Sequence, residues 1–135
     1  MRFTLVSAHK KILDVASVDS VSLPAAGGTM EVLPGHEPFF AAVKPGVLKV
    51  RAAGKETTYA VGEGLLETDG KSVTMLADTI ESPDDLSQAD VAARRAAAQK
   101  LVAELAASGT QDPDTLVEAE MALLRETARA QVSAH

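Results

Sequence analysis

Residues 39–51 read FFAAV-KPG-VLKVR, and this stretch decides the fold class of the first half of the chain. Apolar residues dominate 39–43 and alternate with charged residues over 47–51, which is typical of two short strands with a buried face. Between them, Pro45 presets the first central position of a turn and Gly46 can supply a positive φ at the second. The stretch therefore predicts a strand, a tight turn and a second strand.

The same pattern recurs on both sides of this stretch. Near residues 72–76, Val73 and Met75 alternate with Ser72 and Thr74, the period-2 signature of a strand with one buried face. Turn residues interrupt the first 86 residues about every ten positions, which favours an all-β sandwich or flattened barrel of many short strands. The strands predicted from the residues alone span 3–8, 18–23, 39–43, 47–51, 56–61, 65–68 and 72–76.

Residues 87–135 have a different composition, rich in alanine and other strong helix formers. Ser87 is a suitable N-cap and Gly109 a suitable end for one helix, and Asp112-Pro113 is a strong start for a second. We therefore expect a β-sandwich domain over 1–86 and an antiparallel two-helix hairpin over 87–135, with helices at about 88–107 and 113–132. Small alanine side chains bury little area, so the hairpin should need docking and should be able to undock.

Charge and composition narrow the class of partner. The 135 residues carry 13 Lys and Arg against 19 Asp and Glu, a formal net charge of −6, and only 3% are aromatic. Such a chain is poorly suited to nucleic acid or to anionic lipid, because both need clustered basic residues. No run of about 18 uncharged apolar residues predicts a membrane span, so we expect no direct lipid insertion. A protein–protein role is favoured.

The sequence shows no catalytic or cofactor-binding arrangement. His9, His36 and His135 are far apart, and there is no cysteine to act as nucleophile or metal ligand. The run Gly27-Gly28-Thr29 lacks the Gly-Lys-Ser/Thr of a phosphate-binding loop. We expect no catalytic residue, no cofactor and no metal.

Four blocks, in this order and spacing, resemble the epsilon subunit of bacterial F-type ATP synthases. The resemblance extends over essentially the whole chain. Each block alone is a weak signal, but the set is specific. The blocks are Val32–Phe40, Val43–Leu48, Gly62–Glu67 and Val73–Thr79.

This resemblance implies a ten-stranded sandwich and a non-catalytic role in a rotary motor. In the family the sandwich binds the gamma subunit and rests on the ring of c subunits, which couples proton flow to rotation. The hairpin lies folded on the sandwich or extends along gamma towards the alpha and beta subunits, where it blocks ATP hydrolysis. The expected location is the cytoplasmic face of a bacterial plasma membrane, as a peripheral part of the complex.

Carried over by position, the elements that face the c-ring are the turn at Ser7 and a loop formed by Thr29, Met30, Glu31 and Val32. Many relatives have a Gly-Glu/Asp-Leu-Gly run here. This chain lacks the second glycine and carries its acid two places later, at Glu31. That carboxylate either faces a basic group on the ring or is a solvated loop group of little energetic value.

A second set of candidates surrounds the Pro-Gly turn of the first block. Leu33, Phe39 and Phe40 are either anchors at an interface or part of the sandwich core, and core is the favoured interpretation. His36 is interpreted as a histidine of the turn rather than as a general base, because no nucleophile or orienting carboxylate accompanies it.

Some relatives bind ATP through an Ile/Leu-Asp-x-x-Arg-Ala motif at the start of the first helix and two arginines on the second. Here Ser87 stands at the Asp position and Asp90 at the Arg position. An anion in place of a phosphate-facing cation inverts the local field, so we expect no ATP site. Arg125 and Arg129 match the second-helix arginines and are interpreted as surface charges.

The inhibitory contact of the family pairs basic residues of the second helix with an acidic segment of beta. From residue 112 onward this chain carries five acids against two arginines, so the helix would be repelled and inhibition should be weak or absent.

Two other functions stay open at this point. A free-standing β-sandwich adaptor could use the hairpin to bind another helical partner, and binding to gamma would discriminate against it. A small carbohydrate-active or isomerase sandwich is disfavoured, because aromatic residues are few and no paired catalytic groups are present.

Overall fold

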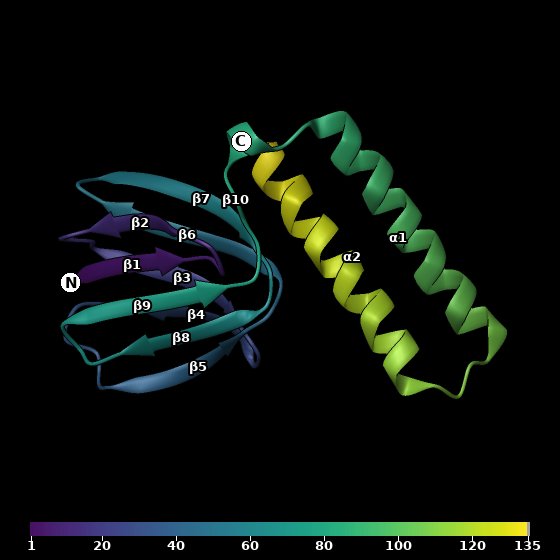
Figure 1. The fold of residues 1–135 in the computed structure, drawn as a ribbon, viewed down its shortest axis with the longest axis horizontal. Helices are drawn as coiled ribbons and strands as arrows, with labels where there is room; N and C mark the ends of the chain where they lie inside the picture. Colours follow the sequence, from purple (N-terminus) through teal and green to yellow (C-terminus); the bar gives the residue numbers. More distant parts are fainter. Residues whose placement is uncertain (135) are drawn as a thin grey trace.

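The computed structural model describes residues 1–134 and shows a ten-stranded sheet followed by two helices (Figure 1). His135 lies outside the described residues. The sheet folds over itself into a flattened barrel, and the two helices lie side by side with α2 against one end of it (Figure 1). This arrangement confirms the expected fold class.

The strands run in the order β10-β7-β6-β3-β5-β8-β9-β1-β2, with β4 paired to β3 off this path. All pairings are antiparallel except that of β1 with β9, which is parallel. The bounds are β1 Arg2–Val6, β2 Lys11–Val15, β3 Ser20–Ala25, β4 Gly28–Val32, β5 Phe39–Val43, β6 Gly46–Ala52, β7 Lys55–Val61, β8 Gly64–Thr68, β9 Ser72–Ala77 and β10 Ile80–Glu81.

Three of these strands are absent from the prediction made from the residues alone. β2 has no strict alternation in KILDV, and β10 is only two residues long. Thr29–Val32, expected as a loop, lies in β4 and pairs with β3. The turn at 26–27 brings β4 back along β3, with Gly28 at a φ of 128°. Pairing with a neighbour, not local propensity, forms these strands.

Alternate side chains of the strands fill a single apolar core. Its largest fully buried members are Phe3, Leu5, Leu23, Leu48, Leu66 and Met75. The expected role of Gly46 is wrong, because its φ is not positive. Instead, a Cβ at Gly46 would overlap the ring of Pro24, so glycine is required by close packing of β3 and β6.

The C-terminal helices are α1 (Gln88–Ser108) and α2 (Pro113–Ser133). The Ser87 hydroxyl accepts a hydrogen bond from the Asp90 backbone N–H at 3.4 Å, and the Asp112 carboxylate accepts one from Asp114 at 3.1 Å. Gly109 ends α1 in the left-handed region at φ 68°. A short 3₁₀ turn, η1 (Pro83–Asp85), joins the sheet to α1.

We predict that Gly64→Ala destabilises the sandwich by about 1–3 kcal/mol or more. A Cβ at Gly64 would overlap the β9 backbone at Leu76 and would lie 2.8 Å from Ala77 Cα. Urea unfolding of the full chain measures the effect. Gly27→Ala is the matched control, since a Cβ there meets nothing within 4 Å. Equal stability of the two variants would contradict the prediction.

Candidate interaction surfaces

An apolar patch crosses the outer face of four neighbouring strands. Ala42 on β5 lies opposite Leu65 on β8, Leu65 lies opposite Leu76 on β9, and Leu76 lies opposite Val6 on β1. Leu65 and Leu76 are 47% and 51% exposed, and Phe40, two residues before Ala42 on the same face, is 70% exposed. We call Val6, Phe40, Ala42, Leu65 and Leu76 the sheet patch. A contiguous exposed apolar surface of this kind marks a place where a partner binds.

The sheet patch also has a shallow hollow that a side chain of a partner could enter. Its volume is about 240 Å³, and its lining includes Ala8, Gly64, Leu65 and Leu76. The small residues Ala8 and Gly64 leave this space open beside the two leucines. The patch therefore combines exposed anchors with a recess, as binding surfaces for apolar partners do.

The structure corrects the expectation that Leu33 and Phe40 belong to the core. Adjacent strand residues point to opposite faces, so Phe39 packs partly against the core while Phe40 points outward. Leu33 lies just beyond the end of β4 and is exposed. The rings of His36 and Phe39 are stacked at a tilt, with centroids 4.7 Å apart. The adjacent residues Phe39 and Phe40 thus differ in role, one in the core and the other on the surface.

The residues expected to face the c-ring differ in what they offer a partner. In β4, Thr29 and Glu31 point outward and are exposed, whereas Met30 packs partly against the core. Val32 is fully buried, so its side chain cannot face a partner, contrary to expectation. Ser7 lies in the β1–β2 turn, where its backbone N–H donates to the carbonyl oxygen of Lys10 at 2.9 Å.

Strand register places Ser7 and Thr29 at the same end of the sandwich. Val6, Leu76, Leu65 and Ala42 form one cross-strand row, and the next residue of β5, Val43, pairs with Ala25, which pairs with Gly28. Leu33 and His36 follow the far end of β4 and lie at the opposite end. The structure therefore divides the expected interface residues between two ends.

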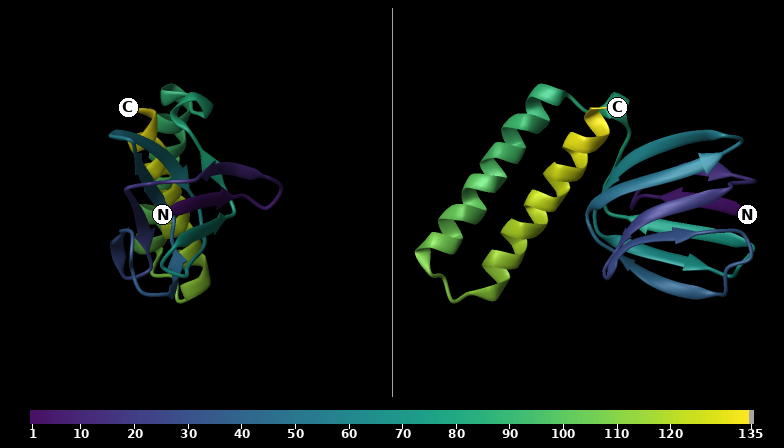
Figure 2. Two further views of the ribbon diagram at one scale, coloured as in Figure 1. Left: turned by 90° about the vertical axis from the view of Figure 1, so that its left-hand side faces the viewer. Right: turned by 180° about the vertical axis from the view of Figure 1, so that it is seen from behind.

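A second surface joins the hairpin to the sandwich. Ala128 and Val132 of α2 pack with Ala60 of β7, and Val47 and Leu86 flank this contact. Only α2 lies against the sheet, with α1 on its far side (Figure 2). Few apolar side chains take part, so burial alone gives the docked hairpin modest stability.

Ion pairs reinforce this docking. The Arg129 Nε donates to Glu81 of β10 at 2.6 Å, and its Nη1 donates to Glu126 of α2. The other oxygen of Glu126 faces Arg94 of α1, with its Nε 3.6 Å away. Arg129 thus connects the sheet edge with both helices. We call Glu81, Arg94, Glu126 and Arg129 the hairpin latch.

The electrostatics of the latch keep its central arginine charged. Burial by itself would lower the pKa of Arg129, but the hydrogen bonds and negative charges of Glu81 and Glu126 outweigh it and raise the pKa above its ordinary value. A group already charged at neutral pH stays charged there when its pKa rises.

The expectation that Arg125 and Arg129 are surface charges holds for Arg125, whose ion pair is exposed, and is wrong for Arg129. Arg125 Nη2 donates to Glu63, in the turn before β8, at 3.1 Å, and the Arg129 side chain is only 18% exposed. The acidic partners Glu63 and Glu81 were not singled out from the sequence. They are 62 and 48 residues from the arginines they bind, and no local pattern pairs residues at such distances.

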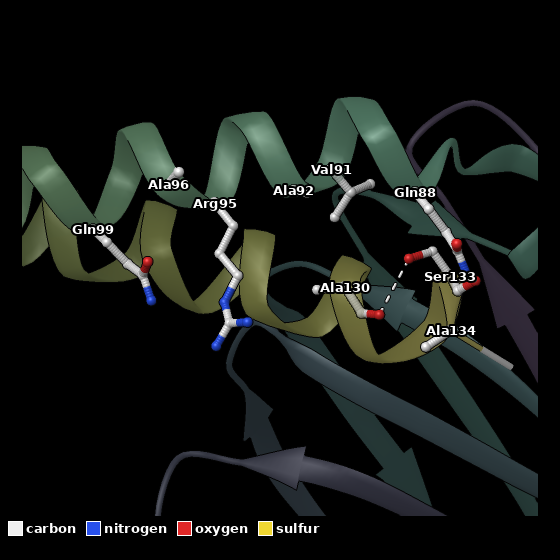
Figure 3. A pocket seen from close by; sticks show the side chains of 9 residues that line it. All are labelled: Gln88, Val91, Ala92, Arg95, Ala96, Gln99, Ala130, Ser133 and Ala134. Atoms are coloured by element: carbon white, nitrogen blue, oxygen red, sulfur yellow. Dashed lines mark hydrogen bonds between the residues drawn. The ribbon is translucent and has the colours of Figure 1, made fainter.

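A hollow of about 380 Å³ lies between the two helices near Gln88 (Figure 3). Arg95 and Gln99 extend from α1 over α2, and Gln88 Nε2 donates to the Ser133 carbonyl oxygen at 2.8 Å. Arg125 and Arg129 are not among its lining residues. The second-helix arginines and this hollow do not form one site.

Metal-binding clusters and membrane-spanning helices are both absent from the part of the chain that the structure describes. Within residues 1–134, no three His, Cys, Asp or Glu side chains are grouped so that they could hold a metal ion. In the same residues, neither helix has a stretch long and apolar enough to cross a membrane.

The sequence matches the family model described as ATP synthase, Delta/Epsilon chain, beta-sandwich domain, over residues 1–83. It is 35% identical over 133 residues to the ATP synthase epsilon chain of Herpetosiphon aurantiacus, covering 98% of this chain and 93% of the relative. It is 37% identical over 127 residues to that of Bordetella petrii, covering 92% and 86%.

The fold also resembles a chain in the structure of the Euglena gracilis mitochondrial ATP synthase, OSCP/F1/c-ring. The TM-score is 0.79 at 21% identity, covering 98% of this chain and 80% of that one. A chain of the Tetrahymena thermophila mitochondrial ATP synthase central stalk/c-ring gives 0.57 at 14% identity, covering 98% and 92%.

We predict that Glu81→Gln weakens docking of the hairpin by about 1.5–3 kcal/mol, because it removes a charge-assisted hydrogen bond from Arg129 in a partly buried setting. Hydrogen exchange of the α2 amides measures the effect and should become faster. Glu56→Gln, which removes the exposed pair with Arg51, is the control and should leave α2 unchanged. Unchanged exchange in Glu81→Gln would show that apolar packing alone holds the hairpin.

Proposed function

The chain belongs to the ATP synthase delta/epsilon family, and from this premise we propose that it is a non-catalytic central-stalk subunit of a bacterial proton-translocating ATP synthase. In this role it couples rotation of the c-ring to gamma and the catalytic head. It would lie at the cytoplasmic face of the plasma membrane as a peripheral part of the complex. Its proposed partners are gamma, the c-ring and, through the hairpin, the alpha and beta subunits.

The observation that carries this proposal is the sheet patch, which we assign to gamma. A subunit that transmits torque needs a broad and rigid contact with its partner. Apolar side chains on four hydrogen-bonded strands provide such a contact, because the sheet holds them at fixed spacing. Leu65 and Leu76 lie at its centre and Phe40 at its margin.

We assign the contact with the c-ring to the outer face of β4, through Thr29 and Glu31, and to the β1–β2 turn at Ser7. Both exposed β4 side chains lie on one face, so Glu31 can meet a basic group on the ring with Thr29 beside it. Within residues 1–134, Glu31 makes no ion pair, which leaves its charge available.

The hairpin is proposed to be a weak regulator that rests on the sandwich without nucleotide. The two arginines that would face phosphates bind Glu63 and Glu81 instead. Ser87 and Asp90, which stand at the expected motif positions, form the exposed cap of α1. Intramolecular carboxylates therefore replace the anion that the arginines would bind.

We expect Leu76→Ser to weaken binding to recombinant gamma about tenfold or more, because it removes a central apolar anchor. Titration calorimetry with the full chain measures the affinity. Leu101→Ser, at an exposed position of α1, is the matched control and should bind like the unmodified chain.

Three results of this titration would lead to different conclusions about where gamma binds. Weaker binding by Leu76→Ser alone supports the assignment of the sheet patch. Equal binding by both variants would place gamma on another surface. No binding of gamma by the unmodified chain would refute the proposed function and favour the free-standing adaptor.

We expect the full chain to inhibit ATP hydrolysis by the complex weakly, with less than about a twofold rise in rate when the chain ends near residue 87. The reason is the acidic surface of α2, which would meet an acidic segment of beta with repulsion. ATPase rates of complexes with either chain measure this effect. Strong activation on truncation would contradict it.

ATP titrated into the isolated chain should give no heat of binding at neutral pH, because Asp90 replaces a phosphate-facing cation and both arginines are paired. ADP provides the matched control for weak, unspecific heat. Saturable binding of ATP would show that the arginines exchange their carboxylates for phosphate.

A further inference from the structure

The apolar face of α2 continues beyond the part that the sandwich covers. Val117, Met121 and Leu124 follow one another at spacings of four and three, and Ala128 and Val132 continue the same helical face. Ala128 and Val132 are buried against the sheet. Val117 and Leu124 are 55% and 38% exposed, although their spacing places them on the same helical face as Ala128 and Val132. This half of the stripe has no cover within the described chain.

A groove runs between the uncovered stripe and the sheet. It has a volume of about 490 Å³ and is lined by Glu63, Val117, Glu118, Met121 and Arg125. The ion pair between Arg125 and Glu63 crosses it at 3.1 Å and holds its two walls together. The groove is therefore a product of hairpin docking, since one wall is α2 and the other is the sandwich.

The groove and the sheet patch are lined by adjacent residues of the chain. Glu63 lines the groove, and Gly64 and Leu65, the next two residues, line the hollow of the patch. A partner seated on Leu65 and Leu76 is therefore next to Glu63, the sandwich residue that lines the groove. One partner can thus contact both the sheet patch and the groove.

Charge indicates the chemistry of the segment that fits. Arg125 is neutralised by Glu63, so Glu118 supplies the remaining charge of the lining, and Asp114 and Glu120 lie exposed nearby on α2. The floor is apolar, from Val117 and Met121. The complementary segment carries apolar side chains with at least one Lys or Arg beside them.

We infer that gamma, seated on the sheet patch, extends such a basic, apolar segment into this groove and contacts Val117 and Met121 while the hairpin is docked. The inference rests on the proposed function, because it takes gamma as the occupant of the patch. Binding of gamma then stabilises the docked hairpin, and docking completes part of the binding surface for gamma. The two equilibria are reciprocally linked.

The test uses the full chain and recombinant gamma. The double variant Val117→Ser, Met121→Ser should raise the Kd for gamma about five- to thirtyfold, and Leu101→Ser should not change it. Serine has nearly the same helix propensity as valine but a lower one than methionine, so circular dichroism checks that α2 stays folded. In the unmodified chain, gamma should also slow hydrogen exchange along 113–133, and the double variant should lose this protection.

Leu65→Ser separates failure of the inference from failure of the proposed function. If Leu65→Ser weakens binding and the double variant does not, gamma stays on the patch and the inference is overturned. If both bind gamma normally, gamma uses another surface and both assignments fail. Dimerisation of the isolated chain, abolished by the double variant in sedimentation, would make a second copy the occupant and would also overturn the inference.

Discussion

The ion pairs of Arg129 hold the helical hairpin in place on the sandwich. This one side chain binds Glu81 at the edge of the sheet and Glu126 on its own helix, and Glu126 faces Arg94 on the other helix. Without it, the docked hairpin would rest on the small apolar contact of Ala128 and Val132 and on the exposed pair of Arg125 with Glu63. A docked hairpin in turn forms the groove beside Glu63. Partly buried charge pairs of this kind give orientation and specificity more than net stability.

The balance of these forces suits a part that docks and undocks. A large apolar contact between the hairpin and the sheet would keep the hairpin docked at all times. Without any contact, the hairpin would stay undocked. A small apolar contact with a few ion pairs leaves two arrangements within a few kcal/mol of each other. A partner that binds only the docked form can then shift the population, and it shifts the equilibrium by no more than its preference for that form. Gamma bound in the groove, as proposed, would bind the docked form preferentially.

Much of the fold could be predicted from local signals. The alternation in residues 72–76, the turns, and the Asp112-Pro113 start of the second helix each depend on neighbours within a few residues. Strands β2, β4 and β10 could not be predicted in this way, because pairing with β1, β3 and β7 creates them. The roles of Phe39 and Phe40 depend on the register of β5, which points one ring inward and the other outward. A one-residue shift would have exchanged them.

The sequence by itself determined the class of each half, the absence of cysteine, the negative net charge, and the caps at the starts of the two helices. These depend on composition and on spacings within a turn of helix or strand. Only the tertiary structure decided that Arg125 and Arg129 bind Glu63 and Glu81, and that Phe40, Leu65 and Leu76 share one outer face. Residues far apart in the chain meet through the order and register of the strands, and no local pattern encodes that order.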